Sequence, residues 1–435
     1  MPQRCGGGIS RCGNGARSPR TRGAGHCRRH GLPDHSNARR LFLAGGALGL
    51  GAVLTAGRSA ADPSKEIPAG PTGRPDPQLE EAPPLAPAQR VGWAVVGLGH
   101  YAQAYVLPAL ARSRRSRTVA LVSGNPEKAR GVAARHGVSE RALYGYDTME
   151  RLADNPDVAV VYIVTPNASH PELTVKAFEA GKHVICEKPM ANSAAECQRM
   201  IDAARAADRR LMIAYRAHWE PHNLRAKQMF DAGDLGAVWF ASSDHHRPLD
   251  PSRPRDQWRV KRAVAGGGSL VDIGIYALNG LQWFFGESPN AVAATMQAPP
   301  GDPRFAEVEN VFTAELAFPS GRRATISSGY TADKKRIDLW GDRLVATLDP
   351  ATAYQGNRLV VANAKKAEEV LTQETSAAQF TGELDHFSQV VAEGGAVRTP
   401  GEMGLRDMRL IEALYRAARE RRWLDLNPDM TLRGT

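Results

Sequence analysis

The chain has 435 residues, of which 42% are apolar and 23% charged, as in a soluble globular protein with room for two domains. Its formal net charge of +10 comes from its start, because residues 1–61 hold ten Arg and one Asp while the rest holds 46 basic and 45 acidic residues. A nearly neutral body gives no support to a nucleic-acid partner, which would need an extended basic surface.

Residues 1–61 have the order of parts of a twin-arginine export signal. An Arg-rich region leads to Arg39 and Arg40, a Gly/Ala/Leu stretch follows to about Ala56, and small residues end at Ala61. The apolar stretch is shorter than the roughly 20 residues of a membrane-spanning helix, so a lasting membrane anchor is the less favoured alternative. The sequence therefore predicts export to the periplasm or another extracytoplasmic space.

Three of the five cysteines lie in this leader, and their spacing to its histidines fits no tetrahedral metal site. We therefore predict no metal. The other two cysteines, Cys186 and Cys197, are too few for a disulfide framework, even in an oxidising compartment.

Residues 62–90 contain eight prolines and almost no apolar periodicity, which predicts an extended arm or linker. Over residues 91–215, short apolar runs alternate with helical patterns, and this alternation predicts a Rossmann-type domain with a parallel sheet. The apolar runs are Val91–Val96, Thr118–Val122, Val158–Val164, His183–Cys186 and Leu211–Ala214, and the helical patterns are one from about Ala102 and those at Pro126–His136, Pro171–Ala180 and Ala194–Ala207.

Residues 216–435 have a different pattern, which predicts an α+β domain with a large, mostly antiparallel sheet. The expected strands are Val238–Ser243, Ala291–Met296, Asn310–Phe318, Ala324–Tyr330 and Arg336–Leu348, and the expected helices are Asn223–Ala232, Ser269–Phe285, Ala377–Ala392 and Glu402–Glu420. We expect the Ser269–Phe285 helix to cover one face of the sheet, and the closing helices could also pack back on the first domain. An exposed sheet face would favour a homo-oligomer, either a dimer or a tetramer.

The first apolar run leads directly into a G-x-G-x-x-A motif at a helix start. Gly97 permits the tight turn, Gly99 lets a pyrophosphate approach the backbone, and the small Ala102 lets helix and strand pack closely. Alone the motif is a weak signal, but at the head of a βαβ series it predicts dinucleotide binding. The predicted cofactor loop comprises Gly97, Leu98, Gly99, His100, Tyr101 and Ala102.

The second strand ends without the carboxylate that NAD-binding domains place against the ribose hydroxyls. The residues found there instead are Ser123, Gly124, Asn125 and Lys128. Neutral donors beside Lys128, with Arg115 and Arg117 just before the strand, would accept a 2′-phosphate, so we predict NADP rather than NAD. The alternative for Lys128 is a solvated position in the first turn of a helix.

Two further strand ends point to the same crevice, because ligands of open parallel sheets bind at the carboxyl ends of the strands. The residues there are Thr165, Pro166, Asn167 and His170 at one strand end, and Glu187 and Lys188, followed by Pro189, at the next. Pro and Asn are also ordinary turn residues, so either segment could be no more than a loop start. Their convergence favours cofactor binding.

Several motifs are recognisable together: Gly97-Leu-Gly-His-Tyr-Ala, Leu121-Val-Ser-Gly-Asn, Cys186-Glu-Lys-Pro-Met, Gln257-Trp-Arg, Gly266-Gly-Gly-Ser-Leu-Val-Asp-Ile-Gly-Ile-Tyr and Leu410-Ile-Glu-Ala-Leu-Tyr. With them the chain resembles the Gfo/Idh/MocA oxidoreductases, and among these the glucose-fructose oxidoreductases. The resemblance extends from about Val91 to the end of the chain and implies export of a folded, NADP-loaded protein.

The resemblance also implies roles for five residues. Lys188 of the Glu-Lys-Pro motif would be catalytic beside the nicotinamide, and Asp272 and Tyr276 would form the D-x-G-x-(H/Y) motif of a substrate helix. Many relatives have His at the last position, whereas this chain has Tyr276, as the glucose-fructose enzymes do. Trp258 and Arg259 would be cofactor contacts from the second domain.

The chemistry of sugar oxidation agrees with these roles. Oxidising a cyclic sugar at C1 removes a hydroxyl proton as hydride leaves, and a free Tyr, with a pKa of ~10, is a poor base at neutral pH. An adjacent ammonium would lower that pKa. We therefore predict Tyr276 as the acid/base, Lys188 as its electrostatic partner, and Asp272, four residues away on the same face of an α-helix, as the group that orients sugar hydroxyls. A Tyr that merely packs its ring is the structural alternative.

These predictions describe an exported oxidoreductase with tightly bound NADP that oxidises an aldose to a lactone and reduces a second sugar, such as fructose to sorbitol. Three alternatives stay open: a sugar dehydrogenase that releases its cofactor, an NAD-dependent exported glycoside hydrolase, and a dinucleotide-binding sensor without catalysis. The hydrolases carry His where this chain has Tyr276. Further candidates for the sugar pocket, without assigned roles, are Tyr215, Arg216, His218, Tyr330 and Tyr354.

Overall fold

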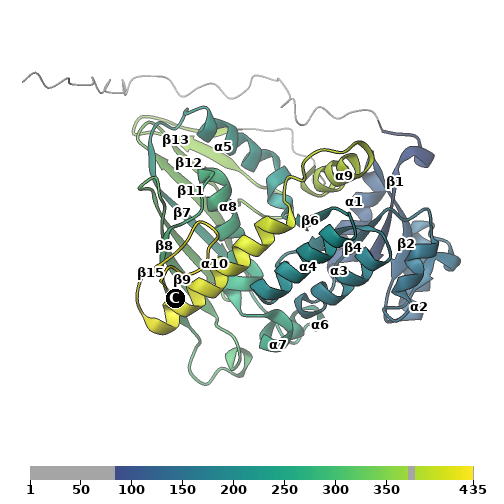
Figure 1. Ribbon diagram of the computed structural model, residues 1–435. Helices are drawn as coiled ribbons and strands as arrows, with labels where there is room; N and C mark the ends of the chain where they lie inside the picture. Colours follow the sequence, from purple (N-terminus) through teal and green to yellow (C-terminus); the bar gives the residue numbers. More distant parts are fainter. Residues whose placement is uncertain (1–83, 371–377, 435) are drawn as a thin grey trace, which may run out of the picture. The chain divides into compact units, whose positions relative to one another are not determined.

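Two β-sheets organise the residues that the computed structural model describes, which are 84–370 and 378–434 (Figure 1). One sheet has six strands and the other has nine. The predicted export signal and most of the predicted arm lie outside the described residues, so both stay predictions.

The six-stranded sheet is parallel throughout and has the strand order β3-β2-β1-β4-β5-β6. Its strands are β1 (Val91–Val96), β2 (Ser116–Val122), β3 (Leu143–Tyr144), β4 (Val160–Ile163), β5 (His183–Glu187) and β6 (Leu211–Ala214). The helices between them are α1 (Leu107–Arg112), α2 (Pro126–His136), α3 (His170–Glu179) and α4 (Ala194–Ala206). The predicted Rossmann-type sheet is confirmed, with β3 as a short edge strand that the apolar pattern did not reveal.

The strand order reverses beside β1. The chain runs outward from β1 through β2 to β3, and then returns to place β4 on the other side of β1. The loops at the carboxyl ends of β1 and β4 therefore diverge, which opens the crevice where dinucleotides bind in such sheets. β1 is buried along nearly its whole length, as expected of a strand covered on both faces.

The nine-stranded sheet has the order β14-β13-β12-β11-β7-β10-β9-β8-β15, and only the β7–β10 pair is parallel. Its strands are β7 (Val238–His246), β8 (Ala291–Gln297), β9 (Val311–Ala317), β10 (Arg323–Gly329), β11 (Lys334–Gly341), β12 (Val345–Leu348), β13 (Leu359–Ala362), β14 (Ala367–Val370) and β15 (Leu424–Asp425). The prediction of one strand over Arg336–Leu348 is wrong, because a turn at Asp342 and Arg343 folds this segment into the β11–β12 hairpin.

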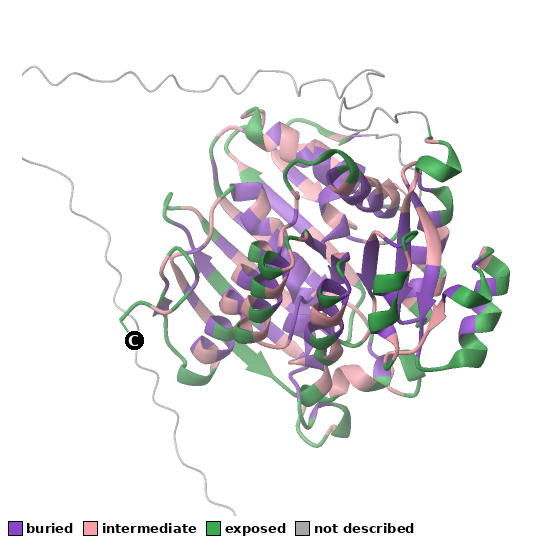
Figure 2. Cartoon of the chain, turned by 45° about the vertical axis from the view of Figure 1, so that its right-hand side comes forward, coloured by how far each residue is buried: buried purple, intermediate pink, exposed green. Residues whose placement is uncertain are grey.

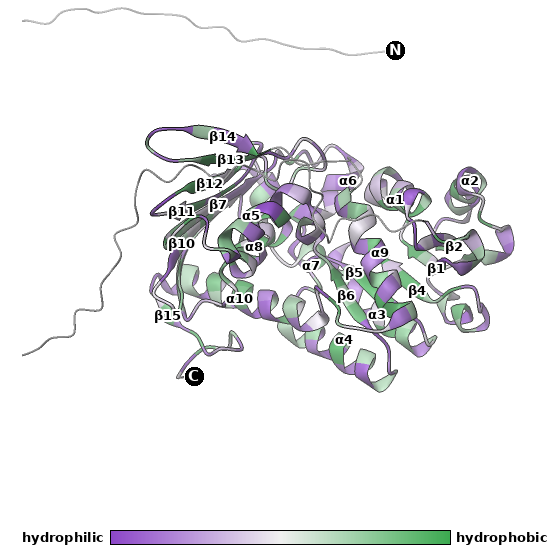
Figure 3. Cartoon of the chain, turned by 90° about the horizontal axis from the view of Figure 1, so that it is seen from above, coloured by the Kyte–Doolittle hydropathy of each residue, from purple (hydrophilic) through white to green (hydrophobic). Residues whose placement is uncertain are grey.

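Helices fill the space between the two sheets, as Figure 3 shows from above. α8 (Ile275–Phe285) packs on β7 and β10, and α5 (Pro221–Asp231) packs on β12 and β13. α10 (Gly401–Glu420) contacts β8 on one side and α4 and β6 on the other. Most residues of α8 are buried, and Figure 2 shows buried residues in the strands and in the helices between the two sheets.

α9 (Ala378–Glu393) packs against the parallel sheet rather than the large one. The indole of Trp93 in β1 donates a hydrogen bond to Ser388 Oγ at 2.9 Å. The first residue of this predicted helix, Ala377, lies outside the described residues. The closing helices α9 and α10 thus both contact the first domain.

The substrate helix does not begin as the α-helix that the sequence predicts from Ser269. Leu270–Gly274 forms a π-helical turn, η8, before α8 starts at Ile275. The three glycines ahead of it are closely packed: a Cβ added at Gly267 would lie 2.2 Å from the Tyr415 hydroxyl, and one at Gly268 would lie 2.1 Å from the carbonyl oxygen of Glu309. The predicted α-helix is therefore corrected at Asp272, which lies in the π-helical turn, whereas Tyr276 lies in α8.

Candidate active site

The loop after β1 is shaped to receive a dinucleotide. Gly97 has a φ of +94°, and a Cβ added there would lie 2.5 Å from the Val164 carbonyl oxygen, so the turn requires glycine. A Cβ added at Gly99 would meet nothing within 4 Å, which leaves open space above the backbone. Leu98 and Ala102 are buried. The loop therefore fits the pyrophosphate approach that the motif predicts.

The end of β2 carries the predicted ribose contacts, but two of the arginines that supported NADP lie elsewhere. Arg115 pairs with Glu393 at 2.6 Å and Arg117 with Asp157 at 3.2 Å, both at the amino end of the strand. The argument from these two cations is wrong, because ligands bind at the carboxyl end of a parallel strand.

The remaining residues at this strand end carry no negative charge that would repel a 2′-phosphate on the ribose. Ser123 is buried, and Gly124, Asn125 and Lys128 are exposed. The Asn125 side chain caps α2 by accepting from the Lys128 backbone N–H at 2.9 Å. Lys128 thus lies in the first turn of the helix that follows β2, and no carboxylate stands at Ser123, Gly124 or Asn125.

His170 joins two strand-end loops. Its Nδ1 lies 2.9 Å from the Pro189 carbonyl oxygen, and its Nε2 lies 2.9 Å from the Thr165 carbonyl oxygen. Nearby, the Asn167 side chain donates to the Ala265 carbonyl at 2.9 Å, while Pro166 is exposed. The geometry supports a positioning role for His170 and Asn167, and their contact with cofactor stays a prediction.

Lys188 and Tyr276 meet, as the sequence predicts. The Lys188 Nζ donates to the Asp272 carbonyl oxygen at 2.8 Å and lies 4.6 Å from the centre of the Tyr276 ring. Burial lowers the pKa of Lys188, whereas Asp272 and Glu187 act against this shift. An ammonium from the first domain thus meets a buried phenol from the second.

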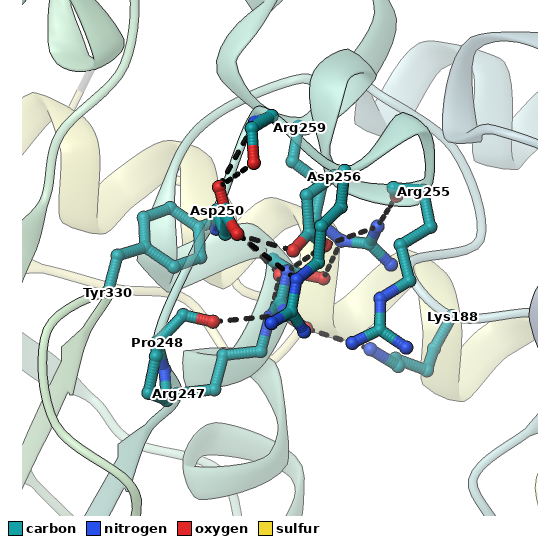
Figure 4. Close-up of polar contacts among 11 residues, drawn as sticks. Lys188, Arg247, Pro248, Asp250, Arg255, Asp256, Arg259 and Tyr330 are labelled. Atoms are coloured by element: carbon teal, nitrogen blue, oxygen red, sulfur yellow. Dashed lines mark hydrogen bonds and ion pairs between the residues drawn. The ribbon is translucent and has the colours of Figure 1, made fainter.

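Asp272 forms an ion-pair cluster with two arginines, and Figure 4 shows these arginines, Arg247 and Arg259, close to Asp256. Arg247 Nε contacts one carboxylate oxygen of Asp272 at 3.0 Å and Arg259 Nε the other at 3.2 Å. Both arginines also contact Asp256, at 2.7 and 3.3 Å. Burial opposes ionisation of Asp272, but Arg259, Arg247 and Lys188 outweigh it and hold its pKa below the usual value.

This cluster changes how two predicted residues are understood. Each carboxylate oxygen of Asp272 already forms an ion pair with an arginine. A sugar hydroxyl that binds Asp272 would have to share these oxygens with the arginines. Arg259 binds Asp272, and its guanidinium lies 4.4 Å from the ring centre of Trp258. The predicted cofactor contacts and the substrate helix are therefore one connected unit.

Sequence reasoning missed Arg247 and Asp256. Arg247 follows β7 directly, and Asp256 lies two residues before Trp258. A charged residue immediately after a half-buried strand was the available signal, but it did not indicate a partner 25 residues away.

Tyr276 is buried among charges of both signs. Burial raises the pKa of its phenol to about 12, Arg216 acts against this shift, and Glu187 and Glu383 add to it. The expectation that Lys188 brings this pKa toward neutral pH is therefore wrong, because burial raises the pKa and the largest lowering effect comes from Arg216. Its guanidinium carbon lies 5.2 Å from the Tyr276 ring centre.

An aromatic cluster stands beside this group. Tyr101 of the cofactor loop contacts Tyr105, Tyr354 and Phe380 with ring centres 5.5 to 6.2 Å apart. Tyr354 is 38% exposed and so forms the rim of the cluster. His100 is exposed and meets Tyr105 edge to face at 6.3 Å. Aromatic faces of this kind pack against the apolar faces of ligands.

The other pocket candidates have different positions. Tyr215 is buried and donates to Asp407 at 2.6 Å, and His218 bonds Asn279 at 2.7 Å. Both belong to a polar network in the core behind α8. Tyr330 is buried and its hydroxyl lies 3.4 Å from an Asp272 oxygen, so it supports the ion cluster.

Cys186 and Cys197 are buried free thiols. Over residues 84–370 and 378–434, no group of three or more His, Cys, Asp or Glu could hold a metal ion. A search of the same ranges finds no helix with the length and apolarity needed to cross a membrane.

Comparison with known proteins assigns both halves of the chain. Residues 91–215 match the model of an oxidoreductase family with an NAD-binding Rossmann fold, and residues 227–426 match the C-terminal α/β domain of the same family. The chain belongs to the Gfo/Idh/MocA oxidoreductases. As a member of this family it is an oxidoreductase with an NAD(P)-binding domain.

Among Gfo/Idh/MocA members, several similar proteins are named for sugars. An aldose-aldose oxidoreductase from Caulobacter crescentus, crystallised with glycerol, is 42% identical with a TM-score of 0.75, and the match covers 78% of this chain and 100% of that one. A D-xylose 1-dehydrogenase [NADP(+)] from Haloarcula marismortui is 30% identical over 75% of this chain and 91% of its own length. A levoglucosan dehydrogenase bound to NADH and levoglucosan shares the fold, with 23% identity, a TM-score of 0.68, and coverage of 78% of this chain and 99% of that one.

Proposed function

We propose that this chain is an exported sugar oxidoreductase that keeps NADP bound, oxidises an aldose at C1 to a lactone, and reduces a second sugar, such as fructose, to a polyol. The observation that carries the proposal is the contact between the half-buried Lys188 and the buried Tyr276 beside the carboxyl edge of the Rossmann sheet. The 42% identity to an aldose-aldose oxidoreductase supports a two-sugar reaction.

Each residue of the site has a defined task in this reaction. Tyr276 accepts the C1 hydroxyl proton during oxidation and returns a proton to the carbonyl oxygen during reduction. Lys188 supplies positive charge against the Tyr276 ring, 4.6 Å from its centre. Asp272, held by Arg247 and Arg259, fixes the turn whose carbonyl binds Lys188. When bound, NADP supplies the hydride acceptor and donor.

The residues that would hold the dinucleotide are the Gly97–Ala102 loop, Ser123, Asn125 and Lys128. A strand end with Ser123 in place of a carboxylate favours NADP, because a 2′-phosphate meets no repulsion there. The name of the Haloarcula relative, which specifies NADP(+), supports this choice.

Retention of the cofactor follows from the proposed location. A protein exported by the predicted twin-arginine signal has no pool of free NADP, so recycling one bound molecule between two sugars lets it turn over. The protein would act without a lasting membrane anchor, on small-molecule sugars rather than nucleic acid, and as a homo-oligomer.

The decisive experiment is to purify the exported protein, identify any bound dinucleotide by mass, and follow its absorbance as sugars are added. We expect the absorbance of reduced nicotinamide to rise when an aldose is added and to fall when a ketose or second aldose follows. Absence of any absorbance change over a panel of aldoses and ketoses, with dinucleotide still bound, would contradict the proposal.

A sugar dehydrogenase that releases its cofactor is the second candidate, favoured by the name of the Haloarcula relative. Gel filtration separates the two functions. A protein that loses its dinucleotide on the column, and then needs added NADP to oxidise an aldose, is the releasing dehydrogenase.

A further inference from the structure

Arg216 is the least expected feature of the site. It follows β6 at the start of a short 3₁₀ helix, η6 (Arg216–Trp219), and is 3% exposed. Its Nη2 donates to the Thr352 carbonyl at 2.7 Å, and its Nη1 donates to the Ala353 carbonyl at 3.4 Å and to the Gln379 side chain. Its Nε has no hydrogen-bond partner in the described structure. Hydrogen bonds from both terminal nitrogens thus fix the buried guanidinium in place, while its Nε–H is left without an acceptor.

The clamp holds this guanidinium against the proposed acid/base. The Arg216 Cζ lies 5.2 Å from the ring centre of Tyr276 and 4.5 Å from that of Tyr354. Lys188 approaches the Tyr276 ring from another loop, at 4.6 Å. Two cations therefore flank the phenol that the proposed reaction must deprotonate.

The two cations differ in how firmly they keep their charge. A buried ammonium can lose its proton, and burial lowers the pKa of Lys188. A guanidinium stays protonated throughout the range in which enzymes work. Of these two cations, Arg216 is the one that offers Tyr276 a positive charge that pH does not remove.

We propose that Arg216 is a positioning residue for the acid/base, whose permanent charge stabilises the Tyr276 phenolate and keeps it able to accept a proton from the aldose. This inference rests on the proposed function, in which Tyr276 exchanges the sugar proton. In this inference, the hydrogen bonds of Arg216 to Gln379 and Thr352 hold its guanidinium charge beside Tyr276.

The other groups that face Tyr276 act against the phenolate or are neutral. Glu187 from β5 and Glu383 from α9 raise the pKa of Tyr276, and the phenols of Tyr101 and Tyr354 lie in the same cluster. His245 from β7 stacks on the Tyr276 ring at 6.0 Å, and burial lowers the pKa of His245 to about 3, so it is uncharged at neutral pH. Burial also raises the pKa of both carboxyl groups, and where they ionise, Arg216 and Lys188 are the cations that oppose them.

The test is the pH profile of the NADP-loaded protein with Arg216→Gln. Aldose oxidation needs the phenolate, so we expect the rising limb of its profile to move by about one pH unit or more to higher pH. Sugar reduction needs the protonated phenol, so its activity should persist to higher pH. At a fixed pH on the rising limb, the variant should therefore oxidise the aldose more slowly than the wild type but reduce the second sugar at a similar rate. General damage to the fold would slow both reactions.

Three further variants complete the experiment. Arg216→Lys should return the limb toward the wild-type position, and Arg216→Met is a second neutral replacement in case the Gln variant does not fold. Arg398→Gln is the matched control, because Arg398 also contacts η6, through the His218 carbonyl at 3.0 Å and the Trp219 ring at 5.3 Å. Its limb should stay in place.

The outcomes separate this inference from the proposed function. Suppose that the wild-type protein interconverts sugars and that the neutral Arg216 variants have the wild-type pH profile for both oxidation and reduction. Arg216 then does not act on Tyr276, and the inference is overturned while the proposed function stands. If the wild-type protein transfers no hydride with any sugar, the proposed function itself fails.

Discussion

Single residues in this chain carry chemistry only through their neighbours. Tyr276 is an ordinary phenol by sequence, yet burial raises its pKa to about 12 and two cations flank its ring. Lys188 has a lowered pKa for the same reason, burial. At neutral pH a phenol with a raised pKa is protonated, so its use as a base in the proposed reaction depends on the positive charge beside its ring.

Replacing Tyr276 by Phe tests its role most directly. We expect kcat to fall by about 10²-fold or more in both sugar oxidation and sugar reduction, because both directions lose the proton-transfer group. The ring and its packing remain, so thermal stability and the amount of bound dinucleotide should match the wild type. A variant with wild-type kcat would exclude Tyr276 as the acid/base.

The nucleotide preference also depends on a single position. Ser123→Asp places a carboxylate at the end of β2, where it would repel a 2′-phosphate and accept from ribose hydroxyls. We expect NADP to bind at least about tenfold more weakly, roughly 1.4 kcal/mol, while NAD binds more tightly. Titration of the apoprotein with each nucleotide measures this, and Ser123→Ala, which adds no charge, is its control.

Elements are joined here by charge as well as by apolar packing. The π-helical turn η8 contributes Asp272, the segment after β7 contributes Arg247, and the short helix α6 (Pro254–Gln257) contributes Asp256. The cluster ties the loop that carries Trp258 to the start of the substrate helix. Because its charges are mostly buried, removing one leaves the others unpaired.

Asp272→Asn should therefore destabilise the fold by about 3 kcal/mol at neutral pH. The pKa of Asp272 is lowered in the folded chain, so its stabilisation is present above the unfolded value of about 4 and is lost as pH falls through the lower folded value. Urea unfolding at pH 7 and at pH 3 to 4 measures this, and the difference between wild type and variant should shrink at the lower pH.

The matched control for this variant is Asp250→Asn in the same segment. Asp250 pairs with Arg253 at 3.1 Å, and both side chains are largely exposed, so unfolding should change little. An equal decrease in the free energy of unfolding of the two variants would show that the buried ion-pair cluster stabilises the fold no more than the exposed Asp250–Arg253 pair does.

Replacing Gly268 or Gly99 by alanine should have different effects on stability and on dinucleotide binding. At Gly268 the added Cβ would lie 2.1 Å from the backbone carbonyl oxygen of Glu309, so we expect a loss of about 1–3 kcal/mol or more in stability. At Gly99 the added Cβ meets nothing within 4 Å, so stability should hold while dinucleotide affinity falls. Unfolding curves and nucleotide titrations on both variants distinguish the two roles.

At the scale of the whole molecule, the site is complete only when both sheets are in place. α10 contacts strands of both sheets, and Lys188 of the first domain reaches the turn before α8 in the second. The cofactor loop, the ion cluster and the acid/base are brought together by this packing.

Retention of the cofactor is a property of the whole chain. We propose that the Pro-rich arm, residues 62–90, helps to hold NADP in place. Deleting residues 62–83 should speed NADP release from the purified protein and leave the sugar reaction itself intact when NADP is supplied. Fluorescence of the bound reduced nucleotide during dilution measures the release, and an unchanged release rate would reject a role for the arm.

Much of the fold follows from local patterns. Continuous apolar runs marked β1, β2, β4, β5 and β6, and the G-x-G-x-x-A motif marked the cofactor loop, because these signals depend on neighbouring residues alone. The β11–β12 hairpin was missed because an apolar pattern continues across its turn. Strands β13 and β14 were missed because short strands carry little periodicity of their own.

By itself the sequence determined the two-domain order and the dinucleotide loop, since each rests on residues that stand close together in the chain. The pairing of Lys188 with Tyr276, which are far apart in the chain, was predicted through the family resemblance that their two motifs carry. Only the tertiary structure decided that Arg216 faces Tyr276, that Arg247 and Arg259 hold Asp272, and that Arg115 lies far from the ribose site. The physical reason is that these charges interact across elements, and their partners depend on which loops the packed sheets bring within a few ångströms.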